Sequence, residues 1–133
     1  MNNTRALTWQ AWLAHGDQYL KASKPKGYKN RFGTEIVYNL LSMSLESYIM
    51  AIMDFHHQLP ENHTYTDLFR GLDTVMSVDP DLKARILQYE NIQSICSIEK
   101  YHRTSPSLEE IDDLKGALIE ISEIAHLACK VAA

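Results

Sequence analysis

The sequence predicts an all-α protein: an up-and-down bundle of four long helices and one short helix, in a single domain spanning residues 1–133. Apolar residues recur at spacings of three and four along several segments, which is typical of helices with one buried face. Long alternating runs of β-branched residues are absent, and so are Asn-Gly and Asp-Gly hairpin turns. None of the four prolines interrupts a periodic segment, as expected because proline inside a helix loses a hydrogen bond.

The first two predicted helices span residues 5–22 and 30–57. Thr4 is the expected N-cap of the first, whose buried stripe is Ala6, Trp9, Leu13 and Leu20. The second contains residues 36–53, in which 13 of 18 residues are apolar. Glu46 divides this stretch into uncharged runs of 10 and 7 residues, too short for a membrane span, which needs about 20.

The apolar arc of the second helix is wider than a surface helix requires. Val37, Leu41 and Ile52 define one face, and Ile36 and Met43 extend it. Either the helix is central in the bundle or part of it faces another subunit, and the two interpretations are compatible. This arc is the basis for predicting a homodimer.

Local signals mark the starts of the remaining helices. The third spans residues 65–77 with Thr64 as its cap. The fourth runs from Asp79 and Pro80 to about residue 101, because Asp is a good N-cap and proline suits the first helical position. Ser107 and Glu110 form a capping-box pair at the start of the fifth.

Composition and charge bound the function classes. Apolar residues make up 45% of the 133 residues and charged residues 23%, which excludes a disordered chain. The net charge of −4 argues against a surface coated in basic residues for non-specific nucleic-acid binding. Two cysteines and no secretory signal predict a reducing, cytoplasmic setting.

Two sets of reactive residues are expected to lie too far apart to form a joint site. The fourth and fifth helices are expected to form a hairpin that turns near Ser105. In that hairpin the Glu-x-x-His pairs ending at His102 and His126 lie roughly 27 Å apart, too far to share a metal cluster. Cys96 and Cys129 lie about 22 Å apart, too far for a disulfide, and are expected to be apolar core residues.

Three histidines lie near the loop at Pro60. His56, His57 and His63 are the alternative metal ligands, since imidazole binds transition metals. Nothing in the sequence supplies a fourth ligand, so a solvated loop is favoured and we expect neither a metal nor a cofactor. No phosphate loop, dinucleotide fingerprint or Gly-x-Ser-x-Gly motif occurs.

Two basic segments are candidates for contact with phosphate groups. The first runs from residue 21 to 31, with no acid between Asp17 and Glu35, and the second flanks Tyr101. For the first segment, a solvated loop between two helices is the favoured interpretation. The candidate ligand-binding residues are Lys24, Lys26, Lys29, Arg31, Lys100 and Arg103.

The order of these elements resembles the HEPN (higher eukaryote and prokaryote nucleotide-binding) superfamily of small helical bundles. The resemblance covers about residues 28–128 and rests on three motifs. They are Arg-Phe-Gly-Thr-Glu-Ile-Val with Glu35, Tyr-Thr-Asp-Leu-Phe-Arg-Gly-Leu at residues 65–72, and Lys100-Tyr101-His102 before a capped terminal helix. It implies a helical bundle, a tendency to homodimerise and a role near nucleotides, RNA or a partner protein.

The departures from the family pattern affect its activity. Thr66 stands where many members have His, and Lys100-Tyr101-His102 replaces Arg-Tyr-Pro. No Arg in the chain is followed by four to six residues and then His, the pattern implicated in RNA cleavage. The sequence therefore predicts a non-catalytic, homodimeric binding module for a nucleotide, RNA or protein partner. The alternatives are a divergent, toxin-like ribonuclease using His102 and Arg103, and a metal-binding bundle.

Overall fold

The computed structural model describes residues 8–24, 33–60, 62–90 and 106–130, which form five helices and no strand. This confirms the all-α prediction. Three described helices are long and two are short, rather than four long and one short. The bounds are Trp9–Ser23 for α1, Thr34–Phe55 for α2, Tyr65–Leu72 for α3, Pro80–Leu87 for α4 and Leu108–Ala128 for α6.

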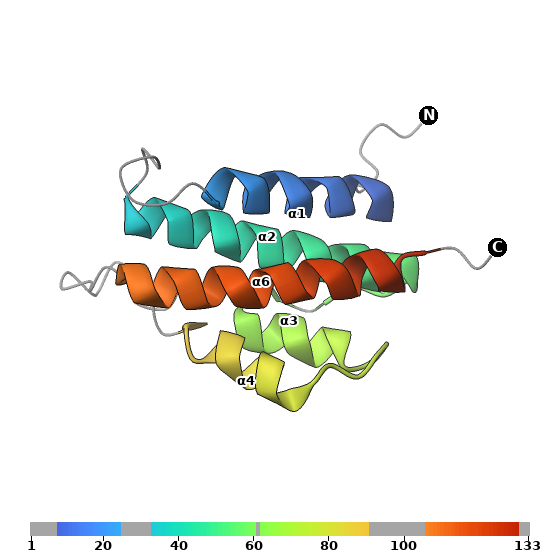
Figure 1. Ribbon diagram of the computed structural model, residues 1–133. Helices are drawn as coiled ribbons and strands as arrows, with labels where there is room; N and C mark the ends of the chain where they lie inside the picture. Colours follow the sequence, from blue (N-terminus) through green and yellow to red (C-terminus); the bar gives the residue numbers. More distant parts are fainter. Residues whose placement is uncertain (1–7, 25–32, 61, 91–105, 131–133) are drawn as a thin grey trace.

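Helix α2 lies at the centre of the bundle. It packs against α1, α3 and α6, while α4 packs against α3 and α6. Figure 1 shows α1, α2 and α6 side by side, with α1 running opposite to the other two, and α3 and α4 forming a shorter layer beside them. Twelve of the 22 residues of α2 are buried, so the wide apolar arc serves mainly this central position.

Among the described residues, α2 is the helix whose length and composition would allow it to cross a membrane. Its most apolar 18-residue window has a mean hydropathy of 1.4, and 67% of that window is buried inside the bundle. The buried core helix of a bundle commonly has these properties, since it must be apolar on nearly every side.

The predicted caps of three helices are confirmed. The Thr64 hydroxyl accepts a hydrogen bond from the Asp67 amide at 3.1 Å, and Asp79 accepts one from the Asp81 amide at 3.0 Å. Ser107 and Glu110 form both bonds of the capping box, at 3.1 and 2.9 Å. These short-range bonds satisfy amides that have no partner within the helix.

The bounds of the first two helices differ from the prediction. Helix α1 begins at Trp9 rather than residue 5, because the extended Thr8 is its N-cap and accepts from the Ala11 amide at 3.3 Å. Thr4 lies outside the described residues. Helix α2 ends at Phe55 rather than residue 57, because His57 has a left-handed φ of 60° that stops the helix.

Two predicted helices are also shorter than expected. Helix α3 ends at Leu72 rather than residue 77, where the Thr74 hydroxyl donates to the Gly71 carbonyl at 2.6 Å. Helix α4 ends at Leu87, and residues 88–89 form a turn, so a continuous helix to residue 101 is wrong. The Tyr38 hydroxyl donates to the Tyr89 carbonyl at 2.8 Å and so provides this oxygen with a partner from α2.

Candidate functional site

An open cavity of about 380 Å³ lies between the C-terminal end of α1 and the first half of α6. Leu20 and Lys24 come from the α1 side. The α6 side contributes Asp112, Lys115, Gly116 and Ile119. Because α1 packs antiparallel to α6, residues from the end of α1 and from the first half of α6, almost a hundred positions apart in the sequence, line the same cavity. The cavity contains Lys24, a predicted ligand-binding residue.

Two lysines give this cavity its basic character. Lys24 is exposed and follows the last turn of α1, where a cation interacts favourably with the negative end of the helix dipole. Lys115 is only 7% exposed, although lysine is rarely buried to this degree. Its ammonium nitrogen lies 3.9 Å from an Asp112 carboxylate oxygen, one turn earlier on α6.

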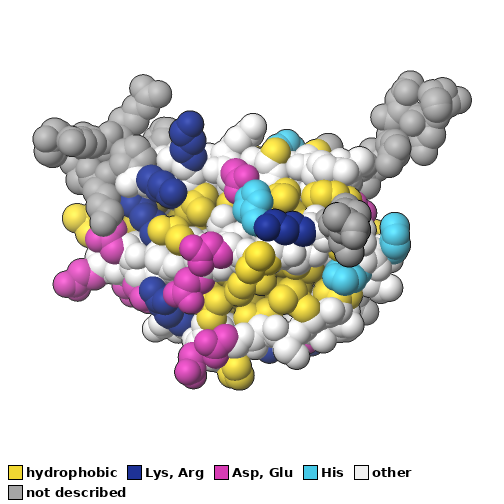
Figure 2. All heavy atoms as spheres, turned by 45° about the vertical axis from the view of Figure 1, so that its right-hand side comes forward, with side chains coloured by type: hydrophobic (Ala, Val, Ile, Leu, Met, Phe, Trp, Pro, Cys, Tyr) yellow, Lys and Arg dark blue, Asp and Glu magenta, His cyan; other side chains and the backbone are white. Residues whose placement is uncertain are grey.

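Figure 2 shows the surrounding surface. Lys and Arg side chains gather over the C-terminal end of α1, beside exposed hydrophobic side chains and close to acidic ones. The mixture of types agrees with the cavity lining, in which two cations, one carboxylate and two aliphatic side chains meet. Such a site can hold a negatively charged group in place through its lysines and contact carbon atoms beside it.

The other predicted basic residues cannot be compared with this cavity. Lys26, Lys29, Arg31, Lys100 and Arg103 lie outside the described residues, as does His102. Lys24, within the first basic segment, follows the end of α1, and Gly33, after that segment, precedes the start of α2; the two helices are antiparallel, and these ends are neighbours in Figure 1.

A second polar cluster lies further along the contact between α1 and α6. The Tyr48 hydroxyl donates to Asp17 at 2.6 Å, and His126 Nε2 lies 2.9 and 3.0 Å from the two Asp17 oxygens. Burial, followed by the hydrogen bond to Asp17, raises the pKa of Tyr48, so its hydroxyl remains a hydrogen-bond donor even in alkaline solution. The cluster thus ties α1, α2 and α6 together.

The three histidines of the alternative metal site lie among the described residues. Among the described residues, no three His, Cys, Asp or Glu side chains gather in a way that could hold a metal ion, and this set includes His56, His57 and His63. His63 Nδ1 instead lies 2.7 Å from a Glu46 carboxylate oxygen. The left-handed backbone of His57 follows the end of α2 and lies between His56 and His63 in the chain.

Cys129 is a buried free cysteine, in agreement with the prediction that it is a core residue. Burial, with a further contribution from the charge of Asp54, raises the pKa of its thiol to about 11. Because the thiolate is the reactive form, this residue is a poor nucleophile at neutral pH. Its predicted relation to Cys96 lies outside the described residues.

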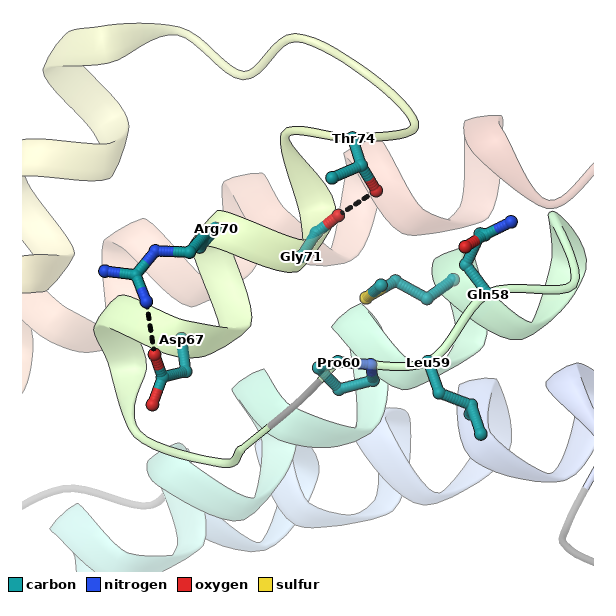
Figure 3. A pocket seen from close by; sticks show the side chains of 8 residues that line it. Gln58, Leu59, Pro60, Asp67, Arg70, Gly71 and Thr74 are labelled. Carbon is teal, nitrogen blue, oxygen red and sulfur yellow. Dashed lines mark hydrogen bonds and ion pairs between the residues drawn. The ribbon is translucent and has the colours of Figure 1, made fainter.

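A second cavity, of about 310 Å³, lies between α3 and the loop after α2 (Figure 3). Leu59, Pro60 and Gly71 form apolar parts of its lining. The charges at its rim are already matched, since Arg70 donates to Asp67 at 2.9 Å within the same helix. This cavity therefore offers less attraction for a charged ligand than the one between α1 and α6.

Another charged cluster has a structural role. Arg85 on α4 donates to Asp113 at 2.8 Å and to Glu120 at 2.9 Å, and the Tyr89 hydroxyl also donates to Asp113. The hydrogen bonds from Tyr89 and Arg85 lower the pKa of Asp113 against the opposing effect of burial. These contacts fasten α4 and the turn after it to α6.

Comparison with known proteins adds no assignment. No protein-family model matches the chain, and neither a curated protein nor a solved structure shows a significant match to it. The resemblance to the HEPN superfamily thus stays a prediction, and the function has to be argued from the geometry of the chain itself.

Proposed function

We propose that this bundle is a homodimeric, non-catalytic binding module whose ligand is anionic and binds in the cavity between α1 and α6. The observation that carries the proposal is the meeting of Lys24 and Lys115 in one cavity, from two helices that are distant in sequence. Lysine ammonium groups attract a phosphate or carboxylate, which is the chemistry that the proposal assigns to this cavity.

The lining of the cavity supports binding rather than catalysis. Its six residues comprise two Lys, one Asp, one Gly and two aliphatic residues. Histidine, the usual acid–base residue, and hydroxyl or thiol nucleophiles are not among them. The chemistry that remains is attraction of charge and contact with apolar surface.

The proposed dimer uses the part of α2 that the bundle leaves exposed. Ile36 is 48% exposed and Met43 is 43% exposed, and they lie two turns apart on one face of the helix. Exposed apolar side chains aligned on one face gain free energy when a second copy of the chain covers them. The face lies at the end of α2 that begins next to the basic cavity.

A salt-dependent binding experiment tests the proposed anion site. Fluorescence anisotropy with labelled AMP and with a labelled short RNA, at about 50 mM and about 200 mM NaCl, measures affinity and its dependence on salt. We expect at least one probe to bind, and to bind more weakly at the higher salt concentration. Lys24→Glu should weaken that binding about tenfold or more, since it replaces attraction with repulsion.

Lys130→Glu is the matched control, because it makes the same change of charge at an exposed position beyond the other end of α6. It should retain more affinity than Lys24→Glu. Equal losses in the two variants would mean that overall charge, rather than this cavity, determines binding. Absence of salt-dependent binding to either probe, and to carboxylate ligands, would contradict the proposal.

A further inference from the structure

The cavity between α3 and the loop after α2 is the second place where a small molecule can bind. Figure 3 shows the loop and α3 facing each other across it. Its volume of about 310 Å³ is at the lower end of the range of about 300–1,000 Å³ that is typical of ligand pockets. A molecule of one or two rings is therefore a suitable size for this cavity.

The charged side chains in its lining are already paired. Arg70 Nη1 donates to one carboxylate oxygen of Asp67 at 2.9 Å, and the Thr64 hydroxyl donates to the other at 2.9 Å. Arg70 and Asp67 are the charged residues among those that line the cavity, and they form an ion pair within α3. A charged ligand would have to compete with these bonds, so the lining favours an uncharged one.

The loop side of the cavity presents apolar surface to solvent. Leu59 lines the cavity and is 66% exposed, and Pro60 follows it. The amide of Gln58 donates to the Met53 carbonyl at 2.8 Å, which holds the start of this loop against the end of α2. A ligand that covers Leu59 removes apolar surface from water, which is favourable.

On the inner side of the cavity, a sulfur atom lies against a glycine. A Cβ added at Gly71 would lie 2.9 Å from the Met53 sulfur and 3.3 Å from Pro60 Cβ, so the missing side chain allows the thioether to approach α3. Met53 is 1% exposed, and the surrounding core holds it in place. Thioether sulfur interacts favourably with aromatic rings at about 5 Å, often at the ring edge, which favours an aromatic ligand over a saturated one.

We propose that this cavity binds a small, uncharged aromatic molecule of one or two rings. The ring covers Leu59 and Pro60 and directs an edge toward the Met53 sulfur. The exposed side-chain amide of Gln58, at the rim, can bond to a hydroxyl group on the ring. The inference goes beyond the proposed function, because it concerns a different cavity and a ligand without charge.

Four probes separate ring type from charge in a titration followed by backbone amide NMR shifts. They are 2-naphthol, its saturated analogue decahydro-2-naphthol, the anion 2-naphthoate and the cation of 2-naphthylmethylamine. We expect 2-naphthol to produce its largest shifts at residues 58–59 and 67–74, and to bind there about threefold or more tightly than each of the others. Equal affinity of any other probe at this cavity, or no saturable shift with 2-naphthol, would overturn the inference.

Matched substitutions of two exposed leucines test the location. Leu59→Asp removes apolar lining and adds a charge, so it should weaken 2-naphthol binding about tenfold or more. Leu127→Asp makes the same change on α6, at a leucine that is 67% exposed, and should leave the binding unchanged. Circular dichroism establishes that both variants are folded, and equal losses of affinity would contradict the site.

Met53→Leu tests the contribution of the sulfur, because leucine has a similar volume and is usually tolerated in place of methionine. It should weaken 2-naphthol binding about twofold or more and leave decahydro-2-naphthol binding unchanged. Equal effects on the two probes would contradict the preference for an aromatic ring.

Lys24→Glu separates this inference from the proposed anion site. Lys24 does not line this cavity, so the substitution should leave 2-naphthol binding unchanged, whatever its effect on AMP or RNA. A loss as large as that caused by Leu59→Asp would place the aromatic ligand in the cavity between α1 and α6 and overturn the inference.

Discussion

At the scale of single residues, Gly16 determines how closely α1 approaches α2. Its carbonyl accepts a hydrogen bond from the Ser44 hydroxyl at 2.9 Å, and the ring of Tyr48 lies directly beside its Cα. A Cβ added here would lie 2.6 Å from one ring carbon of Tyr48 and 2.7 Å from another. The ring belongs to a fully buried residue whose hydroxyl is held by Asp17, so it has little room to move.

We expect Gly16→Ala to destabilise the protein by about 1–3 kcal/mol, because overpacking costs more than the roughly 1 kcal/mol that alanine gains in helix propensity. Urea denaturation measures the free energy of unfolding. Gly33→Ala is the control, since a Cβ there meets no heavy atom within 4 Å, and its effect should be about 1 kcal/mol or less. A stabilised Gly16→Ala variant would show that the two helices can move apart at no cost.

Asp113 links the stability of the fold to pH. Hydrogen bonds from Tyr89 and Arg85 lower its pKa in the folded protein. The resulting stabilisation is present above about pH 4, the range in which an unfolded Asp is ionised, and is lost as pH falls through the lower folded-state pKa. Because the carboxylate is partly exposed, its contribution is about 1 kcal/mol or less.

Asp113→Asn should therefore lower stability at neutral pH and weaken the fall in stability between about pH 5 and about pH 2. Tyr89→Phe removes the largest cause of the lowered pKa and should shift the profile in the same direction while leaving the carboxylate in place. Thermal denaturation across this range provides the measurement. Acid profiles identical to that of the unmodified protein would refute this assignment.

The candidate site shows which residues a sequence can identify. Lys24 belongs to a basic segment without acidic residues, so the local composition of the chain was enough to identify it as a candidate ligand-binding residue. Lys115 was missed, although it occupies a buried position between Leu114 and Leu118 of the apolar stripe of α6, a signal that was present in the sequence. The meeting of Asp17 with His126 depends on tertiary packing and has no local signal.

At the scale of elements, the starts of α3, α4 and α6 were predictable, whereas the starts of α1 and α2 and the ends of α2, α3 and α4 were not. The caps Thr64, Asp79 and Ser107 act within three residues of the chain, so their side chains reveal them. The ends of α2 and α4 depend on the left-handed backbone of His57 and on a hydrogen bond from Tyr38 to the Tyr89 carbonyl. Backbone strain and contacts between distant residues leave no comparable local pattern.

The capping box of α6 provides a test at this scale. Ser107→Ala removes the hydroxyl that accepts from the Glu110 amide, and it should destabilise the protein by about 1 kcal/mol. Ser77→Ala, at an exposed position between α3 and α4, is the control and should change stability by less than about 0.5 kcal/mol. Equal effects of the two substitutions on the urea midpoint would argue against a contribution from the cap.

At the scale of the whole molecule, composition and periodicity predicted the all-α class. Each long helix buries one stripe of apolar residues, and these residues recur in the sequence at spacings of three and four. The same information left two explanations open for the wide apolar arc of α2: a central position in the bundle, or contact with another subunit. Packing against α1, α3 and α6 accounts for most of it. Ile36 and Met43 remain partly exposed, and the homodimer stays a prediction that rests on them.

Light scattering at micromolar concentration should give a mass about twice 15.2 kDa. Ile36→Asp together with Met43→Asp should shift the protein toward the monomer, because two charges cannot be buried in an apolar interface without cost. Leu127→Asp, which introduces one such charge on the exposed surface of α6, should leave the mass unchanged. A monomer at high concentration would mean that the exposed end of α2 stays in solvent.

Mapping of backbone amide NMR shifts during an anion titration tests the central claim most directly, because it locates the ligand without altering the protein. With octanoate and with AMP as separate probes, the account predicts that a bound anion produces its largest shifts at Leu20, Lys24 and residues 112–119, which surround the cavity between α1 and α6. Largest shifts around Gln58 and Arg70, at the second cavity, or no saturable shift with either probe, would contradict it.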